Sequence, residues 1–130
     1  MRISPDVHWI GVNDTESKFF EALWRIPNGV SLNSYLVLGK DKKALIDTVK
    51  EDLFKEYIEN IRRLIDPEDI DYIILNHVEP DHAGSLSKIL SIASKASVIS
   101  SKDGIDLVRH YHQVPFNGIC VKDGDKVDLG

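Results

Sequence analysis

The residue pattern changes near residue 50, and this change limits the folds open to the chain. Before it, apolar runs of strand type are separated by turn signals, at 7–12, 19–26, 31–38 and 44–49. After it, helical segments alternate with short apolar runs; the helices are expected at 51–65, 85–93 and 102–112, and the strands at 71–76, 97–100 and 118–121. Hairpins followed by alternating strands and helices predict a layered α/β (α+β) domain, with helices covering a sheet.

Composition narrows the class of protein further. No apolar run approaches the roughly 18–20 residues that cross a bilayer, and the first residues lack a leader-type apolar core, so we expect a cytoplasmic protein without a membrane partner. The formal net charge of −5 argues against nucleic acid as a partner, because a nucleic-acid footprint needs clustered Lys and Arg. The single cysteine, Cys120, excludes an internal disulfide and a cysteine-only metal site.

Four metal-capable side chains fall within six residues, where a buried apolar run ends. His77, Glu79, Asp81 and His82 directly follow the run at 71–76. Residues two apart in an extended segment point the same way, so His77 and Glu79 can hold one cation together. Asp81 and His82 are adjacent and point apart, which gives them access to a second cation. The spacing therefore predicts two metal ions side by side rather than one.

The donor types narrow the metal. Imidazoles and carboxylates without thiolate fit two iron or two manganese ions at least as well as zinc. A plain alternative is a solvated polar loop, which an isolated H-x-E pair would favour. The full H-x-E-x-D-H pattern after a buried strand, followed by Ala83, Gly84 and a helix, is more specific and favours metal binding.

These residues resemble a known metal motif. His77-x-Glu79-x-Asp81-His82, with Ala83-Gly84-Ser85-Leu86 behind it, is similar to the first metal motif of the metallo-β-lactamase superfamily, whose members mostly carry H-x-H-x-D-H and bind zinc. Glu79 in place of the second histidine resembles the flavodiiron proteins, which reduce dioxygen or nitric oxide at a non-haem di-iron site. Further stretches resemble the same family, so the resemblance covers essentially the whole chain; they are 24–29, 33–36, 44–48 and 121–125.

The resemblance implies both a fold and a ligand set. The chain would be the N-terminal half of a metallo-β-lactamase-like αββα sandwich, with residue 130 near the middle of the domain. His77 and Glu79 would bind one iron and Asp81 the other, whereas the counterpart of His82 is a ligand in only some members. The family completes the two-iron site with a further His, a bridging carboxylate and a last His, which lie beyond residue 130.

The resemblance also implies partners. The family carries a flavodoxin-like domain that binds FMN, which is absent from these 130 residues, and an electron donor such as rubredoxin reduces that FMN. We therefore expect a second polypeptide or a missing C-terminal half, and a homo-oligomer. An incomplete domain should also expose apolar surface where its partner sheet belongs.

Three functions stay open at this point. The first is a portion of a flavodiiron-type oxidoreductase that is incomplete in this chain alone, so its standing as an enzyme by itself is left open. The second is a zinc-dependent metallo-β-lactamase-like hydrolase with a metal-bound water as nucleophile. The third is a non-catalytic partner subunit without metal. Glu79 separates the first two, because its carboxylate favours iron over zinc.

Three polar residues outside the motif bear on the site. Asp47 ends an apolar run and could support the metal loop through a hydrogen bond, or simply cap a turn. His110 and His112, two apart on an expected helix, point about 200° apart and cannot share a metal. We expect these two histidines to interact with the helix terminus or to be exposed.

Overall fold

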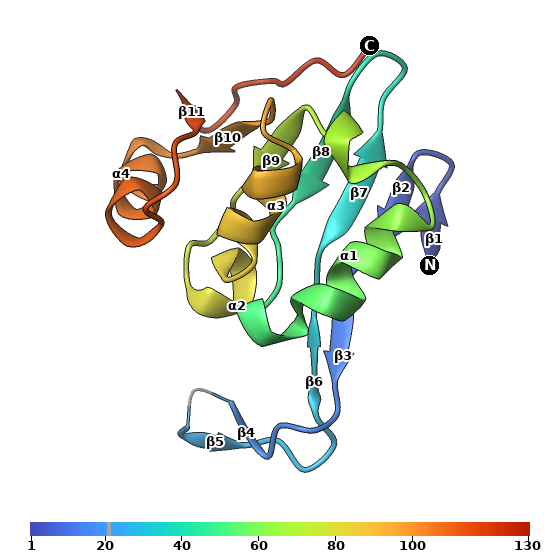
Figure 1. Ribbon diagram of the computed structural model, residues 1–130, viewed down its shortest axis with the longest axis vertical. Helices are drawn as coiled ribbons and strands as arrows, with labels where there is room; N and C mark the ends of the chain where they lie inside the picture. The colour runs from blue at the N-terminus through green and yellow to red at the C-terminus, as the bar shows by residue number, and fades with distance from the viewer. Residues whose placement is uncertain (21) are drawn as a thin grey trace.

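A mixed sheet forms the frame of the computed structural model, which describes residues 1–20 and 22–130 (Figure 1). The strands of this sheet lie in the order β1-β2-β7-β8-β9-β10-β11. They are β1 (Arg2–Ser4), β2 (Val7–Trp9), β7 (Tyr35–Leu38), β8 (Lys43–Ile46), β9 (Tyr72–Ile74), β10 (Ser97–Ser100) and β11 (Asn117–Cys120).

The sheet changes character at β8. The pairs β1–β2, β2–β7 and β7–β8 are antiparallel, whereas β8–β9, β9–β10 and β10–β11 are parallel. Antiparallel neighbours need only short turns, but parallel neighbours need a crossover, usually a helix. The change of pattern near residue 50 therefore marks the change of pairing, and the predicted α/β class is confirmed.

Helices supply the three parallel crossovers. They are α1 (Phe54–Arg62), α3 (Leu86–Ile92) and α4 (Lys102–Tyr111). The connections hold a short helix, α2 (Pro80–Ala83), and two 3₁₀ turns, η1 (Glu51–Leu53) and η2 (Pro67–Asp69). Because parallel crossovers are right-handed and the strand order runs one way, the three helices cover one face of the sheet (Figure 1).

The core lies between this helical layer and the sheet. Leu36, Leu45, Ile73 and Val98 are register neighbours across four strands, and each is fully buried. Buried helix residues pack in the same cluster; among them are Ile61, Ile89 and Ile105. The amphipathic spacing of each crossover helix thus places its apolar side on the sheet.

The face of the sheet away from the helices is also apolar. Tyr35, Ile46 and Ile74 are register neighbours on this face and are half-buried; the row continues through Ile99, which is buried, to Ile119. Ile119, in the last strand of the row, is 36% exposed. The face is therefore partly exposed and apolar, which agrees in part with the apolar surface predicted from the sequence.

The strands expected at 19–26 and 31–38 are wrong as single elements. The first region instead holds a hairpin of β4 (Phe19–Phe20) and β5 (Trp24–Arg25), and the second is divided into β6 (Val30–Leu32) and β7. The chain turns at Ala22, whose φ of 58° is incompatible with a strand. Residue 21, within the expected strand, lies outside the described residues.

The run expected at 7–12 is likewise divided, into β2 and β3 (Val12–Asp14), and β3 pairs with β6. The β4–β5 hairpin projects from the end of this pair (Figure 1). Three of its apolar side chains are largely exposed, namely Phe19, Leu23 and Trp24. Apolar character alone therefore did not distinguish a strand of the main sheet from this projecting hairpin.

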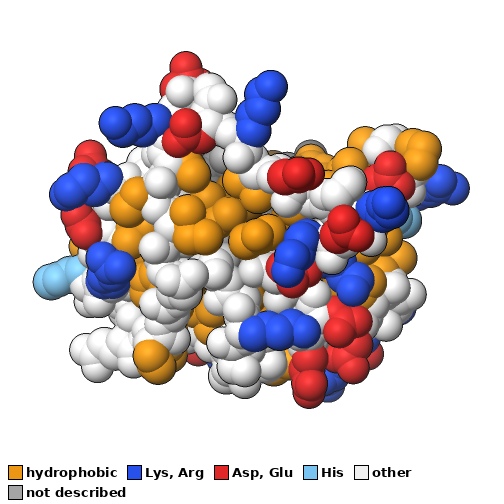
Figure 2. All heavy atoms as spheres, turned by 90° about the horizontal axis from the view of Figure 1, so that it is seen from above, with side chains coloured by type: hydrophobic (Ala, Val, Ile, Leu, Met, Phe, Trp, Pro, Cys, Tyr) orange, Lys and Arg blue, Asp and Glu red, His pale blue; other side chains and the backbone are white. Residues whose placement is uncertain are grey.

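Charged side chains of both signs surround apolar patches at the end of the molecule that carries the β7–β8 turn and residue 130 (Figure 2). On this face Lys and Arg alternate with Asp and Glu and do not form a basic field. Among residues 1–20 and 22–130, no helix combines the length and apolar character that crossing a bilayer requires.

Candidate metal centre

The four candidate ligands lie in the segment that follows β9, which we call the metal loop (residues 77–84). Its first two candidate ligands are paired: His77 Nε2 lies 3.2 Å from Glu79 Oε2. Both side chains are about half exposed. The prediction that these two residues point the same way is therefore confirmed.

The second half of the metal loop is helical, which corrects the expectation of an extended segment. Glu79 is the N-cap residue of α2 and Pro80 is its first residue, so the chain winds into a turn at this point. Asp81 and His82 do not point apart: Asp81 Oδ2 lies 3.4 Å from His82 Nε2. The His82 ring in turn lies edge-on to the His77 ring, with the ring centroids 5.3 Å apart.

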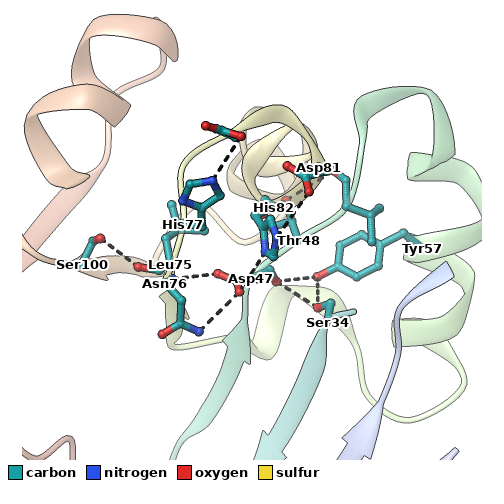
Figure 3. Close-up of polar contacts among 12 residues, drawn as sticks. Ser34, Asp47, Thr48, Tyr57, Leu75, Asn76, His77, Asp81, His82 and Ser100 are labelled. Carbon is teal, nitrogen blue, oxygen red and sulfur yellow. Dashed lines mark hydrogen bonds and ion pairs between the residues drawn. The ribbon is translucent and has the colours of Figure 1, made fainter. Parts of the chain in front are cut away.

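Asp47 joins the metal loop to the sheet, as Figure 3 shows. Its Oδ2 lies 3.2 Å from His82 Nδ1, and its Oδ1 accepts a 2.7 Å hydrogen bond from the Asn76 backbone N–H. The Asn76 side-chain amide donates to Oδ2 as well. Of the two roles left open for Asp47, the structure thus shows support of the metal loop. In the tautomer that donates Nδ1–H to Asp47, the Nε2 lone pair of His82 lies toward Asp81.

The backbone of Asp47 is held by the layer beneath it. Asp47 follows β8 with a φ of 55°, a left-handed conformation that Asp tolerates better than most residues. Its carbonyl oxygen accepts hydrogen bonds from Ser34 Oγ at 2.9 Å and from Tyr57 OH at 3.3 Å. Ser34 and Tyr57 are fully buried, so these hydrogen bonds fix the conformation from which the carboxylate projects.

Burial raises the pKa of the Tyr57 hydroxyl well above its usual range; the hydrogen bond with Ser34 opposes the shift and the charge of Asp47 adds to it. Above about pH 10 the unfolded chain ionises Tyr57 while the folded chain keeps it neutral, so this group lowers stability as pH rises. We expect Tyr57→Phe to cost about 1 kcal/mol at neutral pH, from the lost hydrogen bond. We also expect it to flatten the loss of stability above pH 10 in urea titrations. The exposed Tyr111→Phe is the control, and equal alkaline slopes in Tyr57→Phe and the unmodified chain would contradict the prediction.

A second set of contacts anchors α2. Thr48 donates to the His82 carbonyl oxygen from its backbone N–H, at 2.6 Å, and from its hydroxyl, at 2.8 Å. Gly84 has an ordinary helical φ of −58°, so it is not needed for a left-handed turn. A Cβ on Gly84 would instead meet the Pro80 carbonyl oxygen and lie 2.9 Å from the Glu51 backbone nitrogen. Gly84 therefore permits close packing of α2 against the chain before α1.

His112 is a polar residue near the metal loop whose placement sequence reasoning missed. It lies just beyond α4 and is half-buried, and its Nδ1 is 3.0 Å from Ser87 Oγ of α3. A cavity of about 800 Å³ runs between α3, α4 and the metal loop, and its lining includes His112, Ser87, His77 and Glu79. His112 does contact the end of α4 through its backbone N–H, but it is half-buried rather than exposed, because the turn after Tyr111 brings its ring inward.

Residues 1–20 and 22–130 do not bring three candidate ligands to one point. Within the described ranges, no group of three His, Cys, Asp or Glu side chains is placed to hold a metal ion. The structure brings the candidate ligands together in two pairs, His77 with Glu79 and Asp81 with His82. These pairs are an imidazole and carboxylate donor set of the kind that suits iron, manganese or zinc, and each would need further donors to complete a site.

The fold and the metal-loop sequence have known counterparts. A sequence model described as the ODP family beta lactamase matches residues 30–130. The structure superposes with a TM-score of 0.93 on a mutant flavo di-iron protein from Thermotoga maritima, at 34% identity over 100% of this chain and 33% of that one. It also superposes with a TM-score of 0.92 on the rubredoxin oxygen:oxidoreductase of Desulfovibrio gigas, at 32% identity, covering 100% of this chain and 32% of the other.

Curated relatives agree with the structural matches. The flavo-diiron protein FprA2 of Clostridium acetobutylicum is 39% identical over 100% of this chain and 32% of its own length. The anaerobic nitric oxide reductase flavorubredoxin of Salmonella arizonae is 38% identical over 98% of this chain and 27% of its own length. The chain thus spans about a third or less of the curated relatives named here.

The fold is that of the metallo-β-lactamase-like domain, here as a mixed α/β portion of it. Within that class, the chain belongs to the flavodiiron protein family, whose ODP beta-lactamase domain it matches.

Proposed function

We propose that this chain supplies His77, Glu79, Asp81 and His82 to a non-haem di-iron centre that reduces dioxygen or nitric oxide. The observation that carries the proposal is the arrangement of the metal loop: two imidazole–carboxylate pairs stand next to each other after β9. Relatives described as a nitric oxide reductase and as a rubredoxin oxygen:oxidoreductase support both candidate substrates.

The residues fit iron by donor chemistry, although they do not complete its coordination. Nitrogen and carboxylate oxygen donors suit ferrous and ferric ions, and the charges of Glu79 and Asp81 offset those of two cations. When bound, two irons would supply the electron transfer to the diatomic substrate. His77 and Glu79 would hold one ion and Asp81 the other, with His82 as a further donor.

The rest of the chain orients these ligands. A hydrogen bond donated by His82 Nδ1–H to Asp47 would fix the ring with Nε2 on the metal side. The Asn76 backbone N–H and the carbonyl contacts from Ser34 and Tyr57 keep Asp47 in place. Ligands held in advance bind a metal more tightly, because less conformational entropy is lost on binding.

The incomplete donor set requires a second contribution. We propose that the chain forms the N-terminal part of the di-iron domain and that its apolar sheet face, through Tyr35, Ile46 and Ile74, packs against the remaining part of that domain. We propose further that the working enzyme is a homo-oligomer whose electrons reach the irons from a donor such as rubredoxin, through FMN. The length of the relatives, about three times that of this chain, supports these partners.

The test is the iron content of the chain, with and without the remaining part of the domain. We expect the isolated chain to retain fewer than two irons after gel filtration, and the reconstituted protein, that is, the chain combined with the remaining part of the domain, to hold two. His77→Ala should lower iron affinity at least about tenfold, whereas His110→Ala, at an exposed position of α4, should not.

Three outcomes would contradict the proposal in different ways. Two tightly held irons on the isolated chain would show that the donor set is complete without a second part. Stoichiometric zinc with ester or lactam hydrolysis, and no reduction of either gas, would replace the oxidoreductase by a zinc hydrolase. Absence of any metal from the reconstituted protein would leave a non-catalytic subunit.

A further inference from the structure

The cavity beside the metal loop has a polar wall that the proposed di-iron chemistry does not yet use. On one side it is lined by His77 and Glu79, and on the other by Ser87 of α3 and by Tyr111 and His112 at the end of α4. Its volume of about 800 Å³ is far more than a few water molecules need. A continuous aqueous path can therefore join the two walls.

His112 is built into this wall rather than lying free on the surface. Its backbone N–H donates to the Val108 carbonyl oxygen at 2.8 Å, which ends α4 at a defined place. Its Nδ1 is 3.0 Å from Ser87 Oγ, so the orientation of the ring is fixed across two helices. His110, two residues earlier, is exposed and does not line the cavity. The two histidines thus form a natural matched pair of test positions.

The reaction proposed above consumes protons as well as electrons. Reduction of one dioxygen to two waters takes up four electrons and four protons. Reduction of two nitric oxide molecules to nitrous oxide and one water takes up two of each. A reduced flavin donor can supply the electrons, but the protons must reach the substrate through the protein or its water. General acid groups that do this accelerate reactions by about 10²- to 10⁴-fold.

We propose that His112, held by Ser87, relays protons from solvent through this cavity to substrate reduced at the metal loop. The imidazolium gives a proton to cavity water, which carries it toward the His77–Glu79 side, and the neutral ring then takes a proton from solvent. The ring is neither oxidised nor reduced, and each cycle returns it to its starting state. This inference rests on the proposed reductase function and assigns it a proton path.

The surroundings of His112 suit such a role. Burial lowers the pKa of the ring, and the charge of Glu51 opposes that shift. A lowered pKa makes the imidazolium a stronger acid toward cavity water. The other titratable groups that line the same cavity are Glu51 of η1, His77 and Glu79 of the metal loop, and Tyr111 of α4.

The first measurement needs no metal. Histidine ¹⁵N spectra of the chain should show His112 titrating below 6.5, the ordinary histidine value, and Ser87→Ala should shift the Nδ1 resonance. Titration at or above 6.5, together with an Nδ1 resonance that Ser87→Ala leaves unchanged, would overturn the geometry on which the relay depends.

The second measurement uses the reconstituted protein with two irons. We expect His112→Gln to lower the rate of gas reduction by about tenfold or more, to change its pH profile, and to raise its solvent isotope effect. Added imidazole should restore part of the rate, because the cavity can admit it. His110→Gln should leave the rate and pH profile unchanged. Ser87→Ala should cause a smaller loss of rate. If His112→Gln fails to fold, Ser87→Ala is the variant that tests the relay.

The outcomes separate this inference from the proposed function. If the unmodified reconstituted protein reduces neither gas, the proposed function fails and the relay fails with it. If it reduces gas and His112→Gln matches His110→Gln, only the relay is overturned. A lower rate with an unchanged pH profile and no imidazole rescue would assign His112 a purely structural role and would also overturn the relay.

Discussion

Asp47→Asn should lower the affinity of the metal loop for its metal by about 10- to 100-fold while leaving the fold intact. Asn fits the left-handed conformation at this position, and its carbonyl oxygen can keep the hydrogen bond from the Asn76 backbone N–H. Its amide NH₂ then faces His82 Nδ1, which must accept instead of donate. The His82 proton moves to Nε2, the atom that faces Asp81, and the lone pair available for a metal is lost.

This prediction has a readout that does not depend on activity. ¹⁵N spectra of the chain should show His82 protonated on Nδ1 in the unmodified chain and on Nε2 in Asp47→Asn. Asp47→Asn should lower the unfolding free energy by about 1 kcal/mol, because the Asn76 side-chain amide loses the Asp47 oxygen that accepts its hydrogen bond. Asp106→Asn, on the exposed side of α4, is the matched control and should change neither tautomer nor affinity. An unchanged His82 tautomer with unchanged metal affinity would show that Asp47 does not orient this ligand.

The order of elements was open to prediction because it depends on local patterns. Apolar spacing distinguishes α1 and α4 from the strands, and the change to helical crossovers fixes the parallel half of the sheet. The role of Asp47 could also be predicted from the sequence. Asp47 follows β8 and Asn76 follows β9, and the carboxyl ends of parallel neighbours meet at one edge.

Other features depend on information that the local pattern does not carry. The run 19–26 is mostly apolar and holds neither Gly nor Pro, so neither of the usual turn residues marks the turn at Ala22. The Ser87–His112 contact joins residues 25 positions apart and depends on how α3 and α4 cross the sheet. The turn at Pro80 did carry a signal, since Pro at a first helical position is common, and this signal places Asp81 and His82 on a helix.

The two faces of the sheet should respond very differently to the loss of a side chain, and two adjacent residues of β9 provide the comparison. Ile73 is fully buried under the helices, whereas Ile74 is half-buried on the opposite face. Ile73→Ala should lower the unfolding free energy of the isolated chain by about 2–5 kcal/mol, because it removes packing and leaves a cavity. Ile74→Ala should cost about 1 kcal/mol or less, since Ile74 is itself only half-buried and so removes less packing than Ile73. Urea titrations measure both values, provided that the slope of unfolding free energy against urea concentration is the same in the two variants.

Adding the remaining part of the domain should change the effect of Ile74→Ala but not the effect of Ile73→Ala. If that part packs on this face, Ile74→Ala weakens its association with the chain, whereas Ile73→Ala acts on folding and leaves the contact surface intact. An Ile74→Ala cost as large as that of Ile73→Ala in the isolated chain would mean that the face is already covered. Dependence of that cost on protein concentration would then identify a second copy of the chain as the cover, because association makes apparent stability depend on concentration. A large cost that is independent of concentration would contradict an open face within the chain itself.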